Sequence, residues 1–188
     1  MKYYWLVFVL LFLSGCAIVQ TPIVSSPYSP GATSTIILGQ TPMKITSPDF
    51  NNGDFLPLDF SCRGQGRAPL LQISDVPAGT VSLVLIVDDP DAPAGVFTHW
   101  LAWNINAAET NLNPNNPPAE AVVGVNSAGS NKYVPPCPPR DIHHYYYRLY
   151  ALDEKLNLSV KSQASQIAEA ITGHIIAEAV IMGKVEKK

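Results

Sequence analysis

Proline constrains the fold of this chain more than any other residue type. The 188 residues include 17 prolines, which recur from residue 22 to residue 139. Proline breaks the interior of a helix and is confined to edges, bulges and turns in a sheet. The sequence therefore favours a β-rich domain with many loops over a helical bundle.

The overall charge argues against a nucleic-acid partner. Only 14% of the residues are charged and the formal net charge is −3, so no basic face is expected. The hydrophobic fraction of 47% is enough for a core and ordinary for a globular protein. The length suits one domain with short extensions.

The N-terminus has the features of a secretory signal. Lys2 precedes the apolar run Tyr3–Leu13, which is too short for a typical membrane span. The run leads into Leu13-Ser14-Gly15-Cys16, which is similar to the lipobox of bacterial lipoproteins. We predict a signal peptide over 1–15 and lipidation of Cys16. The alternatives are an ordinary signal peptide with a chance cysteine, or an uncleaved anchor.

The residues after Cys16 predict a flexible linker and the membrane to which the protein is anchored. Gln20–Ser34 is rich in Pro, Ser and Thr and has no charge, which is typical of an extended linker. We therefore expect a flexible tether over 16–35 and a folded domain over 36–188. The lipid would anchor the protein to a membrane of the cell envelope, facing outside the cytoplasm. Ala17 favours the outer membrane if the cell has one, because an aspartate there would resemble the inner-membrane retention signal.

Three strands, two weaker strands and one helix are predicted in the domain. Val81–Val87 is apolar on both faces and indicates a buried central strand. Further strands are expected over Leu101–Ile105 and Tyr145–Leu152, with weaker ones over Leu56–Cys62 and Val122–Val125. A C-terminal amphipathic helix is expected from residues at helical spacing, with Ser162 or Ser165 as its cap and Gly183 at its end. These residues are Ile167, Ala170, Ile171, Ile175 and Ala179.

Two polar clusters are candidates for a site. Asp88-Asp89-Pro90-Asp91-Ala92-Pro93 follows the buried strand, where carboxylates are costly unless they bond to something. His99 comes shortly after, before the next strand. The loop Tyr133–Asp141 is stiffened by prolines and leads to His143 and Tyr145, which alternate and so share a face. His99, His143 and Tyr145 can all donate hydrogen bonds to one oxyanion.

Ordered motifs along the whole domain resemble the phosphatidylethanolamine-binding protein family, in its bacterial branch described as Raf kinase inhibitor-like. The motifs are Ser61-Cys62-Arg63-Gly64, Val76-Pro77-Ala78-Gly79, Asp88–Pro93, His99-Trp100, Gly124-Val125-Asn126, Pro136-Cys137-Pro138-Pro139, His143-His144-Tyr145 and Tyr150-Ala151-Leu152-Asp153. The resemblance implies a β-rich α+β fold, with a central antiparallel β-sandwich and peripheral helices.

The resemblance also implies a pocket for a phosphate-like anion. Its residues would be Asp89, His99, His143 and Tyr145, with backbone of Cys137 and with Asp91, Pro90 and Pro93 shaping its wall.

The loop departs from the family pattern. Pro135 and Asp141 stand where glycine is common, and His144 replaces an arginine. Asp141 adds negative charge near the proposed anion, and His144 is only weakly cationic near neutral pH.

With Cys16 set aside, Cys62 and Cys137 form an even pair, which outside the cytoplasm favours a disulfide over two buried thiols. We expect no metal, cofactor or enzymatic activity, because neither metal-ligand spacing nor a Gly-x-Ser-x-Gly elbow is present. The predicted function is binding of a small anion or phospholipid head group. The alternative is an interaction module that regulates a protease or kinase, with an envelope protein as partner.

Overall fold

The computed structural model describes residues 41–187. The expected signal peptide at 1–15, the lipidated Cys16 and the tether at 16–35 lie outside the described residues, as does the expected domain start near Ile36. Within the described range, no helix is both long and apolar enough to cross a membrane.

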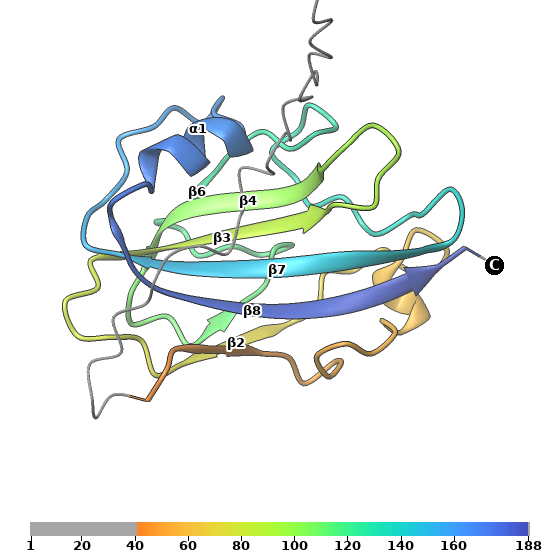
Figure 1. Ribbon diagram of the computed structural model, residues 1–188, viewed down its shortest axis with the longest axis horizontal. Coiled ribbons are helices and arrows are strands. Elements are labelled where there is room, and N and C mark those ends of the chain that lie inside the picture. The colour runs from red at the N-terminus through yellow and green to blue at the C-terminus, as the bar shows by residue number, and fades with distance from the viewer. Residues whose placement is uncertain (1–40, 188) are drawn as a thin grey trace, which may run out of the picture.

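The domain consists of two antiparallel sheets. The larger has the order β6-β4-β3-β7-β8, and the smaller has the order β1-β2-β5 (Figure 1). The larger sheet comprises β3 (Ser82–Asp89), β4 (Phe97–Asn106), β6 (Val122–Val123), β7 (Ile142–Leu152) and β8 (Ile175–Glu186). The smaller sheet comprises β1 (Lys44–Thr46), β2 (Leu71–Ser74) and β5 (Asn111–Leu112). The predicted β-rich α+β fold is confirmed.

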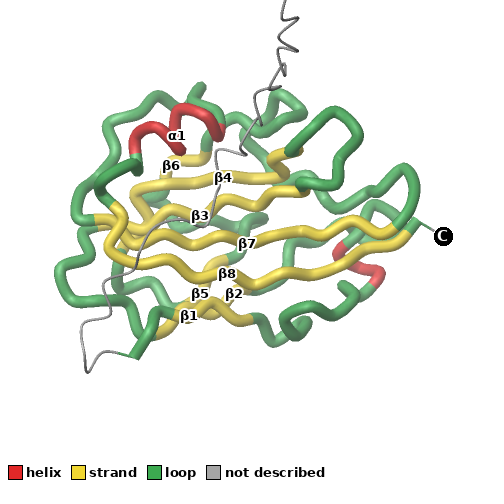
Figure 2. The backbone as a smooth tube through the Cα atoms, viewed as in Figure 1, coloured by secondary structure: helices red, strands yellow, loops and turns green. Residues whose placement is uncertain are grey.

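The central strand β3 is buried on both faces, as predicted, because each face packs against a different layer. Leu83, Leu85 and Val87 belong to the core between the two sheets. Val84 and Ile86 belong to a second core, which the helix α1 (Ala164–Ala170) covers. Figure 2 shows α1 along the β6 and β4 side of the large sheet, with the short strands of the small sheet beyond β8.

The prediction of a C-terminal helix that ends at Gly183 is wrong, because only the first turns of this segment are helical. The helix α1 ends at Ala170, and the chain turns at Gly173, whose φ of +87° suits glycine. Gln163 caps the helix in a reciprocal capping box with Gln166, so neither predicted serine is the cap.

The segment that follows the turn is the longest strand, β8. Its residues alternate between the sandwich core and the outside, and Ile181 and Val185 are buried while Val180 is exposed. The apolar residues of this segment fit both the 3.6-residue period of a helix and the two-residue period of a strand. The segment forms a strand because it pairs with the full length of β7.

The predicted weak strand at Leu56–Cys62 is also wrong. Leu58–Phe60 forms a single 3₁₀ turn that begins after Pro57, with hydrogen bonds from Phe60 N to Pro57 O and from Ser61 N to Leu58 O, both 3.0 Å. Proline favours the start of such a turn because its φ is fixed. Pairing with β8 is confined to the start of the segment, where Phe55 forms an isolated bridge with Lys184 and Leu56 N donates to Lys184 O at 2.8 Å.

Candidate functional site

A small hollow of about 190 Å³ opens where β3 ends and β4 and β7 begin. The two predicted polar clusters meet here, because the three strands are neighbours in the sheet. The lining residues are Asp89, Ala92, Pro93, Phe97, His99, Val134, Pro135, Cys137, Pro139, His143 and Tyr145. Pockets for drug-sized ligands have about 300–1,000 Å³, so this hollow is smaller than such a site.

Asp89 and His143 form a buried pair at the base of the hollow. The Nδ1 atom of His143 lies 2.7 Å from Asp89 Oδ2, and both side chains are about 95% buried. The other carboxylate oxygen of Asp89 accepts a hydrogen bond from Asp91 N at 2.8 Å. The carboxylate therefore fixes the His143 ring and the turn that follows β3.

His99 reaches the hollow because of a β-bulge. Val87 pairs with Trp100 and Asp88 pairs with Thr98, so His99 is an extra residue on β4. Bulges re-aim side chains and are frequent beside functional sites. The ring Nδ1 donates to the carbonyl oxygen of Val134 at 2.7 Å, and Val134 N donates back to His99 O at 3.2 Å.

Tyr145 presents a buried hydroxyl group that is close to the Asp89 carboxylate but makes no hydrogen bond of acceptable geometry with any described residue. Its ring packs edge-on against His99 at 5.2 Å between centroids. Burial, and then the negative charge of Asp89, raise the pKa of the Tyr145 phenol. The hydroxyl therefore stays protonated and can donate a hydrogen bond.

The proline-rich loop is held in place covalently. Cys62 and Cys137 form a disulfide with Cα atoms 5.3 Å apart, and Cys62 N donates to Pro136 O at 2.9 Å. The loop wall of the hollow is thus attached to the segment after the 3₁₀ turn.

Pro90 and Asp91, which were expected to shape the wall of the pocket, are not among the residues that line the hollow. Pro90 lies exposed at the turn. Asp91 Oδ2 instead accepts hydrogen bonds from the backbone N of His144 at 2.8 Å and from its ring Nδ1 at 2.7 Å. Partial burial raises the pKa of Asp91, but the hydrogen bonds from His144 outweigh it and lower that pKa overall.

Sequence reasoning missed the apolar part of the lining. The ring centroid of Phe97 lies 4.8 Å from that of His99. In the sequence, only its position two residues before His99 pointed to a place in the hollow. Val134 and Pro139 belong to the predicted proline-rich loop, but no sequence pattern indicated that they line the hollow. Ala92 was inside the aspartate motif, and Pro135 stood out only as a departure from the family pattern.

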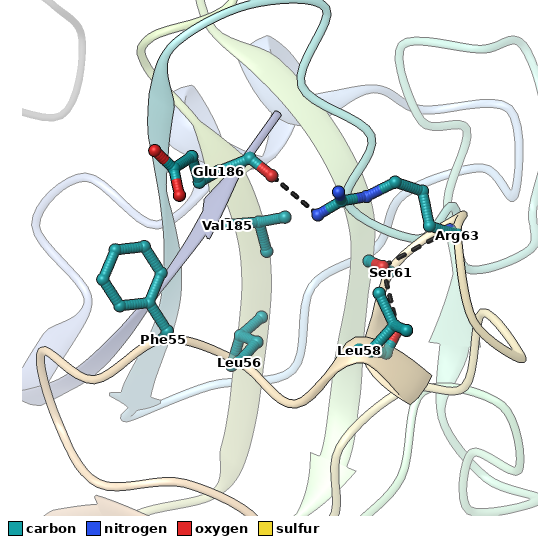
Figure 3. A pocket seen from close by; sticks show the side chains of 7 residues that line it. All are labelled: Phe55, Leu56, Leu58, Ser61, Arg63, Val185 and Glu186. Atoms are coloured by element: carbon teal, nitrogen blue, oxygen red, sulfur yellow. Dashed lines mark hydrogen bonds between the residues drawn. The ribbon is translucent and has the colours of Figure 1, made fainter. Parts of the chain in front are cut away.

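A second, larger hollow of about 680 Å³ lies between the segment around the 3₁₀ turn and the end of β8, and it was not predicted. Figure 3 shows Phe55, Leu56 and Leu58 along its floor and Arg63 at its rim, where the guanidinium donates to Glu186 O at 2.7 Å. Phe55 and Leu58 are 52% and 57% exposed.

No group of three or more His, Cys, Asp and Glu side chains is arranged to hold a metal ion within residues 41–187. The polar side chains among the residues that line the first hollow are the Asp89 carboxylate, the imidazoles of His99 and His143, and the phenol of Tyr145.

Comparison with known proteins agrees with this geometry. The family model for phosphatidylethanolamine-binding protein matches residues 46–186. This chain belongs to the phosphatidylethanolamine-binding protein family. It is 43% identical over 150 residues to a UPF0098 protein of Chlamydia trachomatis, covering 77% of this chain and 99% of the relative. A UPF0098 protein of Methanothermobacter thermautotrophicus is 39% identical over 146 residues, covering 75% and 97%.

Solved structures of the family share the fold. A crystal structure described as a phosphatidylethanolamine-binding protein homologue from Chlamydia trachomatis superposes with a TM-score of 0.74 at 42% identity, covering 78% of this chain and 99% of that one. The Escherichia coli protein YbcL, described as a member of the mammalian family, has a TM-score of 0.72 at 30% identity and covers 79% and 100%.

Proposed function

We propose that this family member is a non-enzymatic binding protein for a small oxyanion, such as phosphate or the phosphoethanolamine head group. The observation that carries the proposal is the buried Tyr145 hydroxyl without a partner beside two imidazoles. Leaving a buried donor unpaired costs about 1–3 kcal/mol, so such a group usually has a functional reason. A ligand oxygen in the hollow would accept its hydrogen bond.

Substitution of Tyr145 by phenylalanine tests the proposal. Isothermal titration calorimetry with phosphate and phosphoethanolamine should show that Tyr145→Phe weakens binding by about tenfold, as expected for one lost hydrogen bond. The free energy of unfolding should not fall, because the hydroxyl has no partner to lose.

A matched control is Tyr133→Phe. The Tyr133 hydroxyl is also near the loop, but it contacts the Tyr147 hydroxyl at 3.5 Å and does not line the hollow. This variant should lose some stability and keep its affinity. If wild type binds neither compound at millimolar concentration, the proposed function is wrong.

We further propose that Cys16 anchors the protein by a lipid to a membrane of the cell envelope, with the domain outside the cytoplasm. The Cys62–Cys137 disulfide supports a place outside the cytoplasm, because disulfides persist in oxidising compartments. Metabolic labelling with an alkyne analogue of palmitate should label wild type and not Cys16→Ala. Equal labelling of both proteins would contradict lipidation at this residue.

The second candidate function is an interaction module for an envelope protein. Two exposed apolar side chains beside the larger hollow, Phe55 and Leu58, favour it. A photo-crosslinking residue at Leu58 should capture one specific protein in intact cells. The control is Val160, which is equally exposed at 58% and does not line this hollow. Capture of the same proteins from both positions would contradict this function.

A further inference from the structure

The hydrogen bond from His99 to the loop fixes which ring nitrogen carries the proton. Nδ1 lies 2.7 Å from the carbonyl oxygen of Val134, and a carbonyl can only accept. Nδ1 therefore holds the hydrogen of the neutral ring. The nitrogen that a ligand in the hollow would meet is Nε2, and in neutral His99 this atom is an acceptor.

The charged and titratable neighbours of His99 come from two strands. Asp89 lies at the end of β3, and His143 and Tyr145 lie at the start of β7. His143 has the Asp89 carboxylate as a counter-charge at 2.7 Å, whereas His99 has only a neutral carbonyl. A proton on His99 therefore has no carboxylate in direct hydrogen-bond contact among the described residues, although the Asp89 charge still acts on it.

The environment of His99 keeps the ring neutral near pH 7. His99 is only 5% exposed, and this burial is the main reason that its pKa is lowered. The Val134 carbonyl and the Asp89 charge act in the opposite direction, and the nearby His143 lowers the pKa further.

We propose that His99 makes the hollow select tetrahedral oxyanions that bring a proton with them, so that hydrogen phosphate binds in preference to sulfate. The inference rests on the proposed function. The O–H group of hydrogen phosphate can donate a hydrogen bond to Nε2 of neutral His99. Sulfate has no such hydrogen, so one of its oxygen lone pairs would face the lone pair of Nε2, which is repulsive. Protonation of His99 in acid turns Nε2 into a donor and opens the site to sulfate.

Calorimetric titration of the full chain with inorganic phosphate and with sulfate tests this selectivity. At about pH 8 phosphate should bind about tenfold or more tightly than sulfate, the range expected when a buried acceptor is left unpaired. Toward about pH 5.5 the affinity for sulfate should rise several-fold, across the range in which histidine titrates. Sulfate binding at neutral pH should take up about one proton, measured in buffers of different ionisation heats.

The variant His99→Gln identifies the residue responsible. A glutamine amide does not titrate and can present either N–H or C=O, so the two anions should bind within about twofold of each other at all pH values. The matched control is His174→Gln. His174 is half-exposed next to Asp153, at the opposite end of β7, and its replacement should leave the selectivity unchanged. Circular dichroism checks that both variants fold.

Two results would overturn the inference while leaving anion binding in place. One is equal affinity for phosphate and sulfate at about pH 8, and the other is sulfate binding without proton uptake. If neither anion binds at millimolar concentration at either pH, the proposed function itself fails and the inference fails with it. The pH series on wild type decides the matter even if His99→Gln does not fold.

Discussion

The Nδ1 atom of His143 lies 2.7 Å from the Asp89 carboxylate, and this contact joins the start of β7 to the last residue of β3. The two residues are 54 positions apart in the chain. Both side chains are about 95% buried, and the Asp89 carboxylate is the hydrogen-bond partner of the His143 ring. The energetics of the candidate site follow largely from this pair.

Asp89→Ala should destabilise the domain far more than Asp91→Ala, although both residues belong to the same turn. Removing one partner of a buried pair costs about 3–5 kcal/mol, because the other polar groups remain buried and unpaired. Asp91 is 39% exposed in its side chain, and its loss should cost about 1 kcal/mol or less. Urea denaturation of both variants checks the difference. Equal losses would mean that Asp89 is not paired in solution.

His99 should make the domain less stable in mild acid. Its pKa in the folded protein is lowered by burial, so the unfolded chain binds the proton more readily. Its stabilising contribution is therefore complete above the unfolded pKa of about 6.5 and is lost as the pH falls from there toward the folded pKa. Urea denaturation without phosphate or sulfate should show a smaller loss for His99→Gln than for wild type between about pH 7.5 and about pH 5.5. Parallel curves would refute this.

Neighbouring residues of β8 should respond very differently to truncation. Ile181 is 3% exposed in the core between the sheets, and Ile181→Ala should cost about 2–5 kcal/mol. Val180 is 42% exposed, and Val180→Ala should change the free energy of unfolding by about 0.5 kcal/mol or less. Thermal and urea denaturation measure both. Similar costs for the two variants would be incompatible with strand alternation in this segment.

Reduction of the Cys62–Cys137 disulfide should lower the free energy of unfolding by up to about 4.5 kcal/mol, the chain-entropy value for a separation of 75 residues. The same reductant should have no effect on a variant with both cysteines replaced by alanine, which serves as the control. Reduction should also weaken phosphate binding, because the loop wall of the hollow loses its covalent attachment. Unchanged stability after complete reduction would show that other contacts hold the loop.

Sequence patterns predicted the parts of the fold that local chemistry specifies. The run Val81–Val87 indicated a strand buried on both faces, and β3 confirms it from Ser82 onward, while Val81 is 47% exposed. The helix and strand periods could not be separated after Gly173, because small and apolar residues there satisfy both. Pairing with the neighbouring strand β7, along the whole length of β7, makes the segment after Gly173 a strand.

For the candidate site, the sequence by itself determined which residue types were available and their order: a carboxylate after a buried strand, two histidines, a tyrosine and a rigid proline loop. It also indicated that they would converge, because neighbouring strands end together. Tertiary structure alone decided the details that matter for chemistry. The bulge that turns His99 into the hollow, the carbonyl of Val134 that fixes its proton, and the burial of Tyr145 all depend on contacts between segments far apart in the chain. Such contacts form only after the strands have paired, so no local pattern in the sequence records them.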